Sequence, residues 1–359
     1  REVLARGGVI GGSSAGASIL GDFLVRGAPS NDNRIMDYPG YEKGFAYLRN
    51  VGIDQHVVAR ERLADLADSI MTTHPNLLGI SEDEGTAWVV RGDTATIIGR
   101  DKAFVYGGRD ATDPGKPFLT LHPGDRYDLG ARHVMHRAVD DSPVSPVFVD
   151  SIFRQYNDPR VGGATVLVAQ NGEVFIDRSY GVPPQTKYMP TTTLPQFQLG
   201  DISGVFSALC TQLPAPGSGR AAAGAASGPG RAAAPPSRPF QSCVTRELSV
   251  PIGLHRTTAA ADGSVASDVD ELYRLELGLE NPRTYSGVNY STGWQSDTYH
   301  GVSRLAAYGA AGGKRNAFVR IPDRRAVVIV LTNDAAADAA KMADAITDRL
   351  LSGDTAARR

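Results

Sequence analysis

Several features that would define a function class are scarce or absent in this 359-residue chain. Charged residues make up 21% and the net charge is -2, so there is no electrostatic case for binding nucleic acid or an acidic membrane face. No apolar run is long enough to span a bilayer. No Cys-x-x-Cys or His/Cys cluster indicates a metal, and no phosphate-binding loop is present. We therefore expect neither a metal nor another cofactor.

Cysteine is limited to Cys210 and Cys243, which flank a low-complexity stretch. We expect two free thiols; the alternative is a disulfide, which would indicate an oxidising compartment and contribute about 3–4 kcal/mol through loop closure. The chain begins at Arg1 rather than Met, close to its first motif, and we expect an N-terminal segment to be missing. The compartment, cytoplasmic or exported, is left open.

The most informative stretch is Gly-Gly-Ser-Ser-Ala-Gly-Ala at 11–17. An apolar run at 8–10 precedes it and a helical pattern follows, so the sequence predicts a strand, a tight turn and a helix, the context of a nucleophile elbow. The turn is expected to need glycine on both sides of Ser14, to present its hydroxyl as a nucleophile, and to aim the Ala15 N–H at an oxyanion. The alternative is that the serines cap the helix.

A second stretch, Val-Gly-Ile-Asp-Gln-His at 51–56, ends a predicted strand on a histidine. The ends of strands are where α/β proteins place active sites, so His56 is a candidate general base for Ser14. Arg60 and Arg62 follow and could bind a substrate carboxylate. The alternatives are a capping histidine and a solvated basic face.

Together these stretches resemble cyanophycinase, a serine exopeptidase family related to dipeptidase E with a class I glutamine-amidotransferase-like sheet. The resemblance covers about residues 5–135 and includes Asp-Glu-Gly-Thr-Ala at 83–87 and Leu-His-Pro-Gly-Asp at 121–125. It implies a peptide substrate: a β-aspartyl-arginine polymer or a short peptide with an N-terminal Asp. It also implies a set of roles: Ser14 as nucleophile, His56 as base, Asp32 as third catalytic member, and Gln55, Arg60 and Arg62 lining the substrate cleft. For Asp32 an Asx turn is the alternative.

Two departures from that family stand out. Asp65 occupies the place of a third arginine, which leaves the substrate open. The family's parallel strands before the elbow, with a second oxyanion donor and a substrate-contacting glutamine, are not in this chain. Loss of one oxyanion donor typically costs about 10²–10³ in rate. We therefore expect this chain alone to be a poor enzyme, or the missing part to come from elsewhere.

The pattern of apolar runs predicts an α/β domain over 1–140, with an N-terminally incomplete, doubly wound, flavodoxin-like sheet that ends in an antiparallel ribbon. Its predicted strands include 77–80, 87–90, 95–98 and 103–106, and Leu63, Leu66 and Ile70 are spaced as one face of a helix.

A second, α+β domain with an antiparallel sheet is expected over 148–352. It should open with a hairpin at Asn171-Gly172 and continue with strands at Gly293-Trp294, 316–321 and 326–331. It should close with a helix that has Met342, Ile346 and Leu350 on one stripe and that Gly353 ends. Six short motifs occur in this order: Gly-Gly-Ala at 162–164, Tyr-Gly at 180–181, Pro-Ile-Gly-Leu at 251–254, Gly-Trp at 293–294, Ile-Pro-Asp at 321–323 and Leu-Thr-Asn at 331–333. Through them this domain resembles serine β-lactamases and penicillin-binding proteins.

The catalytic motifs of that second family are broken. Where Ser-x-x-Lys is needed, Asp201 and Gly204 stand instead, and Ser203 has Phe206 three residues later. The late strand motif would fall at 308–310, Tyr-Gly-Ala. A low-complexity insert at 213–240 is too poor in apolar residues to order itself. We expect this domain to be inactive.

Three functions remain open from the sequence. The first is a serine exopeptidase on the first half, with an inactive companion. The second is a β-lactamase-like esterase or peptidase acting on the second half. The third is a non-catalytic peptide-binding or cell-wall-binding module. A homodimer is not excluded in any of them.

Overall fold

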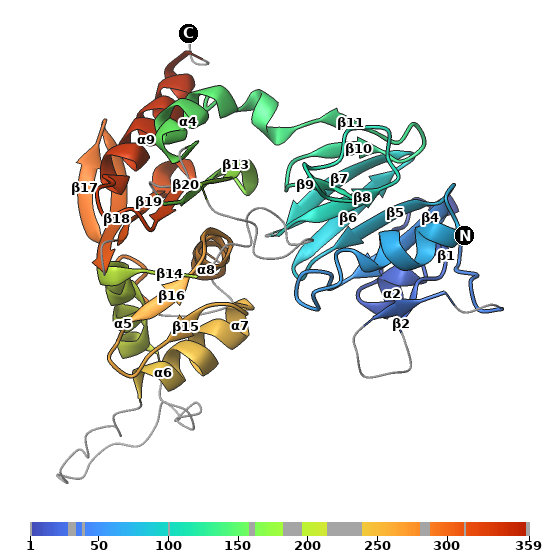
Figure 1. The fold of residues 1–359 in the computed structure, drawn as a ribbon, viewed down its shortest axis with the longest axis horizontal. Helices are drawn as coiled ribbons and strands as arrows, with labels where there is room; N and C mark the ends of the chain where they lie inside the picture. Colours follow the sequence, from blue (N-terminus) through green and yellow to red (C-terminus); the bar gives the residue numbers. More distant parts are fainter. Residues whose placement is uncertain are drawn as a thin grey trace.

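The chain folds into two units that lie side by side (Figure 1). The computed structural model describes residues 2–27, 34–37, 40–99, 101–157, 162–181, 196–213, 239–280, 288–311 and 314–356. Most of the predicted low-complexity insert lies outside these residues. In the described part of the chain, no helix is both long and apolar enough for a membrane crossing.

The first unit is built on a five-stranded sheet whose first three strands are parallel. Its order is β1 (Gly21–Phe23), β4 (Leu48–Gln55), β5 (Leu78–Glu82), β8 (Ala103–Tyr106) and β9 (Leu119–Leu121). β4 pairs in parallel with both β1 and β5, whereas β8 and β9 run antiparallel to their neighbours. The predicted α/β class with a partly parallel sheet is confirmed.

A four-stranded antiparallel sheet forms the predicted ribbon beside it. Its order is β11 (His133–His136), β10 (Arg126–Asp128), β7 (Thr94–Gly99) and β6 (Thr86–Arg91). A small pair, β2 (Arg26–Gly27) and β3 (Ile35–Met36), completes the strands of this unit. Leu63, Leu66 and Ile70 were predicted to face the core from one helix, and all three are buried; the chain there forms a π-helix over Leu66–Ile70 and then α3 (Met71–Thr73).

The second unit is a six-stranded antiparallel sheet with helices on both faces. Its order is β13 (Glu173–Tyr180), β12 (Ala164–Gln170), β20 (Ala326–Thr332), β19 (Lys314–Ile321), β18 (Val302–Ala311) and β17 (Gln295–Tyr299). The predicted hairpin at Asn171-Gly172 is confirmed, since both residues adopt positive φ between β12 and β13. Gly293 and Trp294, predicted as a strand, instead form a turn before β17.

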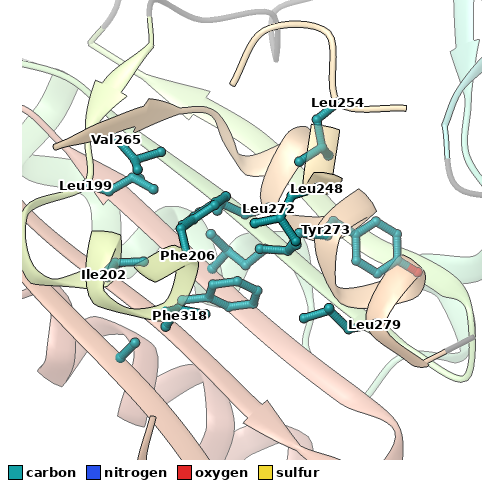
Figure 2. Close-up of a cluster of buried hydrophobic side chains, with 14 of the residues drawn as sticks. Leu199, Ile202, Phe206, Leu248, Leu254, Val265, Leu272, Tyr273, Leu279 and Phe318 are labelled. Atoms are coloured by element: carbon teal, nitrogen blue, oxygen red, sulfur yellow. The ribbon is translucent and has the colours of Figure 1, made fainter. Parts of the chain in front are cut away.

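Two hydrophobic clusters cover the two faces of this sheet. On one face, α4 (Pro146–Phe153) and α9 (Ala339–Ala356) pack through residues such as Phe153 and Ile346. On the other, α5 (Ser203–Gln212), a π-helix at Cys243–Ser249 and α8 (Val269–Glu280) pack against β19, with Phe206, Leu272 and Phe318 at the centre (Figure 2). A short sheet of β14 (Phe197–Gln198), β16 (Val265–Ser267) and β15 (Thr258–Ala259) borders this cluster.

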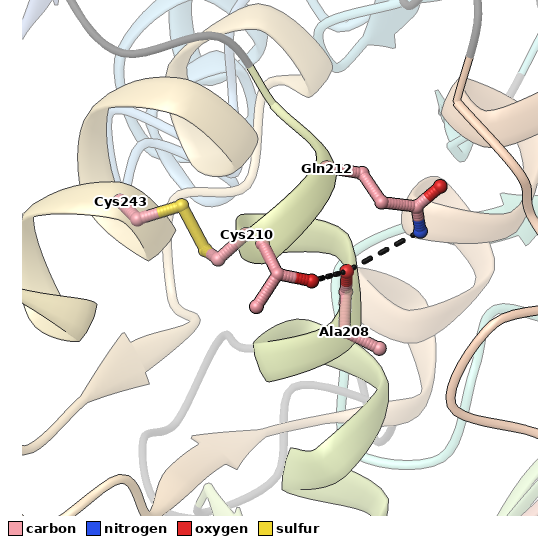
Figure 3. The surroundings of a disulfide bond; sticks show 5 residues. Ala208, Cys210, Gln212 and Cys243 are labelled. Carbon is pink, nitrogen blue, oxygen red and sulfur yellow. Dashed lines mark hydrogen bonds between the residues drawn. A yellow bond between two sulfur atoms is a disulfide. The ribbon is translucent and has the colours of Figure 1, made fainter. Parts of the chain in front are cut away.

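The expectation of free thiols is wrong, because Cys210 and Cys243 form a disulfide (Figure 3). Cys210 lies in α5, whose last turn is closed by Thr211 and Gln212 side chains donating to the Ala208 carbonyl, and Cys243 begins the π-helix. Their Cα atoms are 5.9 Å apart across a sequence separation of 33. The disulfide therefore links the segment before the low-complexity stretch to the segment after it.

Three predicted local elements differ from the structure. Residues 8–13 form no strand, because the segment finds no strand partner among the described residues, and Val9 is 89% exposed. The helix after the motif, α2 (Ala15–Ser18), is a single turn, because the chain enters β1 at Gly21. The closing helix α9 continues past Gly353 to Ala356.

Candidate active site

Ser14 occupies a strained position between an irregular segment and α2. Its backbone has φ 54° and ψ -131°, a region that residues with a Cβ rarely adopt and that is typically held only at functional sites. A Cβ on Gly12 would overlap the carbonyl of Gly16, whereas a Cβ on Gly16 would meet nothing within 4 Å. The turn therefore requires glycine at position 12 only, which corrects the expectation that both are needed.

His56 directly follows β4, and its ring reaches Ser14. Nε2 of His56 lies 3.1 Å from Oγ of Ser14. The histidine also has a positive φ, 57°, so both members of this pair adopt the positive-φ backbone that residues with a Cβ rarely occupy. The structure thus brings together the predicted nucleophile and base across 42 positions of sequence.

The carboxylate that orients His56 belongs to Glu84. Its Oε1 lies 3.0 Å from Nδ1 of His56. Asp32, the predicted third member, falls outside the described residues. Glu84 lies within the sequence motif at 83–87, but no catalytic role was predicted for it. The signal that could have found it is topological: β4 and β5 are parallel neighbours, with Gln55 opposite Glu82, so residues just past both strand ends meet at one edge.

The three side chains form a line suited to proton transfer. With the imidazole proton on Nδ1, His56 donates to the Glu84 carboxylate and its free Nε2 accepts from the Ser14 hydroxyl. The Ala15 N–H begins α2 and has no acceptor among the described residues, as an oxyanion donor requires. This arrangement can generate a serine nucleophile near neutral pH.

The other predicted site residues divide into accessible and buried groups. Arg60 is exposed, with no ion-pair partner in the described part of the chain. Oε1 of Gln55 is buried and lacks a hydrogen-bond partner there, which is unusual for a native polar group. Arg62 is only 3% exposed and pairs with Asp54 at 2.7 Å, while also donating to the Gln55 carbonyl. The structure therefore places Arg62 as an internal cation, in contrast to the predicted cleft role.

Asp54 and Glu82 form an acidic pair at the ends of β4 and β5, the strands that precede His56 and Glu84. Burial raises the pKa of Asp54 to about 6, against the opposing effect of Arg62. Burial, together with the charges of Asp54 and Asp83, raises the pKa of Glu82 to about 8. One oxygen of each carboxyl group has no hydrogen-bond partner among the described residues. Burial therefore favours the protonated form of both carboxyl groups, on the strands that lead to His56 and Glu84.

In the second unit, the structure shows how the residues around the broken Ser-x-x-Lys position are packed. Ser203 is buried at 7% exposure, and its hydroxyl accepts from the Val265 N–H. A Cβ on Gly309 would overlap the Leu199 carbonyl, so the segment at 199–202 packs directly on β18. Within the described residues, no group of three or more His, Cys, Asp or Glu side chains is arranged to hold a metal ion.

No protein-family model matches the chain. Among curated proteins it is similar to cyanophycinase from Synechococcus elongatus, with 32% identity over 146 residues, 36% of this chain and 45% of that protein. Cyanophycinase from Geminocystis herdmanii is 31% identical over 146 residues, 36% of this chain and 53% of the relative. The chain thus spans about half the length of the curated relatives it matches. The predicted resemblance is confirmed over this part.

Among solved structures, the chain is similar to an octameric penicillin-binding protein homologue from Pyrococcus abyssi. The two share 14% identity and a TM-score of 0.43, over 57% of this chain and 77% of that one. A class C β-lactamase variant has 10% identity and a TM-score of 0.43, over 60% of this chain and 99% of that one.

Proposed function

We propose that the chain is a serine peptidase in which Ser14 is the nucleophile, His56 the general base and Glu84 the orienting acid. The observation that carries this proposal is the continuous hydrogen-bonded line from Ser14 Oγ through His56 to Glu84. A nucleophile hydrogen-bonded to a base, which is hydrogen-bonded in turn to an orienting acid, is the geometry by which such triads are recognised on unrelated folds.

The geometry supports a covalent mechanism. His56 Nε2 takes the hydroxyl proton as Ser14 Oγ attacks the scissile carbonyl, and the Ala15 N–H stabilises the oxyanion. The imidazolium, stabilised by Glu84, then gives its proton to the leaving amine. Water, activated by the same imidazole, hydrolyses the acyl-enzyme and restores Ser14.

The substrate we propose is an aspartyl peptide, with the β-aspartyl-arginine polymer first. One feature of the site supports this: Arg60 is exposed and can bind a substrate carboxylate. The relatives named cyanophycinase favour the same class of substrate.

We further propose that the second unit has no hydrolytic activity of its own. Ser203 is buried and its hydroxyl oxygen is engaged by a main-chain donor, and Asp201 and Gly204 cannot supply a serine and a lysine. Its contribution would be structural support or binding.

A fluorophosphonate probe that labels activated serines tests these assignments, on the full chain and on the variants Ser14→Ala and Ser203→Ala. We expect labelling in wild type and in Ser203→Ala, and its loss in Ser14→Ala. Loss in Ser203→Ala alone would assign activity to the second unit, and absence of labelling in wild type would favour a non-catalytic module. Release of β-aspartyl-arginine from its polymer, compared with cleavage of an α-linked Asp-Arg peptide, then tests the substrate.

A further inference from the structure

The second unit touches the candidate active site of the first through a polar, largely buried seam. Lys102, which lies between β7 and β8 of the first unit, pairs with Asp270 of α8 at 2.9 Å. Arg274, one turn further along α8, pairs with Asp83 at 3.2 Å and also with Asp101. All of these side chains are at most 10% exposed, so these charged groups form ion pairs with one another and have little contact with solvent. In Figure 1, α8 lies on the side of its unit that faces the first.

Outside this seam, His255 of the second unit contacts Glu84 of the proposed catalytic triad. Nε2 of His255 lies 2.8 Å from Oε2 of Glu84. His56 uses the other oxygen, Oε1, of the same carboxylate. The two histidines therefore do not compete for one acceptor; together they fix both oxygens of Glu84.

His255 is itself held firmly, although its ring is 41% exposed. The residue before it, Leu254, is buried in the main hydrophobic cluster. The N–H groups of Arg256 and Thr257, which follow it, both donate to Glu271, a fully buried carboxylate of α8. The ring is thus carried on a short segment anchored on either side.

From this juxtaposition we propose that His255 is a positioning residue for Glu84, so that the second unit completes the catalytic machinery of the first. The inference rests on the proposed function, since it concerns the same triad. A glutamate side chain that is about one-third exposed can rotate, and a second N–H donor on Oε2 restricts it to the orientation in which Oε1 meets His56. Misplacement by about 1 Å can cost 10²-fold in rate.

The test compares three variants of the full chain by the rate and affinity of fluorophosphonate labelling at Ser14. His255→Ala is expected to lower the maximal labelling rate by about 10- to 100-fold with little change in probe affinity. His255→Gln, which keeps an N–H donor, should restore most of that rate. His122→Ala is the matched control, because His122 also bridges the two units, to Asp177 at 3.3 Å, without touching the triad. It should label like wild type.

A second measurement does not depend on activity: the downfield proton resonance of the His56 Nδ1–H, observed by NMR. It should be present in wild type and His122→Ala and broadened in His255→Ala. Unchanged labelling and an unchanged resonance in His255→Ala would overturn the inference and leave the proposed function intact, and so would equal losses in His255→Ala and His122→Ala. If Ser14 is not labelled even in wild type, the proposed function fails, and the resonance alone decides whether His255 orders Glu84.

Discussion

Nη2 of Arg274 lies 3.2 Å from Oδ2 of Asp83, the residue that directly precedes Glu84. The other oxygen of Asp83 accepts the N–H of Ala59, three residues past His56. One buried carboxylate therefore links α8 to the two loops that carry the base and the acid. The two units are joined where the proposed chemistry takes place.

Loss of this link should destabilise the fold. Arg274→Met would leave Asp83, Asp101 and Glu271 without a shared cation in a buried setting, which costs about 3–5 kcal/mol. Unfolding by urea measures the change. Arg178→Met removes the half-exposed pair with Asp150 and should cost at most about 1 kcal/mol. Equal losses in the two variants would contradict the role given to the seam.

Glu84→Gln tests the acid that the structure puts in place of the predicted Asp32. The amide has the size of the carboxylate, but it can hold the imidazole in the wrong tautomer and cannot stabilise the imidazolium. We expect Ser14 labelling to fall by about 10⁴-fold, as for comparable triad acids. Glu61→Gln, an exposed glutamate near His56 in sequence, is the control and should label normally. A loss below tenfold in Glu84→Gln would remove the glutamate from the triad.

The two glycines around Ser14 should respond differently to substitution. Gly12→Ala places a methyl group against the Gly16 carbonyl, so the turn must open and Ser14 must leave His56. Gly16→Ala has free space and lies in α2, where alanine is preferred to glycine by about 1 kcal/mol. We expect labelling to be abolished in the first and retained in the second. The reverse result would show that the strained conformation of Ser14 is not what presents it.

Much of this architecture follows from the sequence because local patterns determine it. Alternating and continuous apolar runs predicted β5 to β8, β12, β13, β19 and β20, and the residue types around Ser14 and His56 predicted that this serine and histidine would pair. Buried Leu63 and Ile346 follow from helical spacing alone. These features depend on neighbours in sequence or on one well-defined motif.

The rest depends on contacts between distant segments. Glu84 and His255 meet only because parallel strand ends and a second unit converge, at a separation of 171 positions. Nothing in the local sequence distinguishes Arg62 from an exposed arginine, but in the structure it is buried in an ion pair with Asp54. The pairing of Cys210 with Cys243 likewise depends on how α5 packs against the π-helix. No local pattern encodes these outcomes.

The acidic pair predicts a pH dependence of stability. The folded pKa of Glu82, about 8, lies above the ordinary value of 4.5, so between these values the folded state holds more protons than the unfolded state. Stability should therefore fall as pH rises from about 4.5 through 8, and Asp54 adds the same trend up to about 6. Glu82→Gln should flatten the fall between pH 6 and 8, measured by urea unfolding. An unchanged slope would mean that Glu82 titrates normally.

Arg60 and Arg62 should separate binding from stability. Arg60→Ala removes an exposed cation, so we expect the KM for an acidic peptide to rise severalfold with no loss of stability. Arg62→Ala leaves the carboxylate of Asp54, 1% exposed, without its cation, and should cost about 3–5 kcal/mol. That cost should be smaller at pH 5 than at pH 8. The pKa of Asp54 is already raised to about 6, and without Arg62 the group becomes neutral still more readily as pH falls. A raised KM with full stability in Arg62→Ala would restore Arg62 to the substrate cleft.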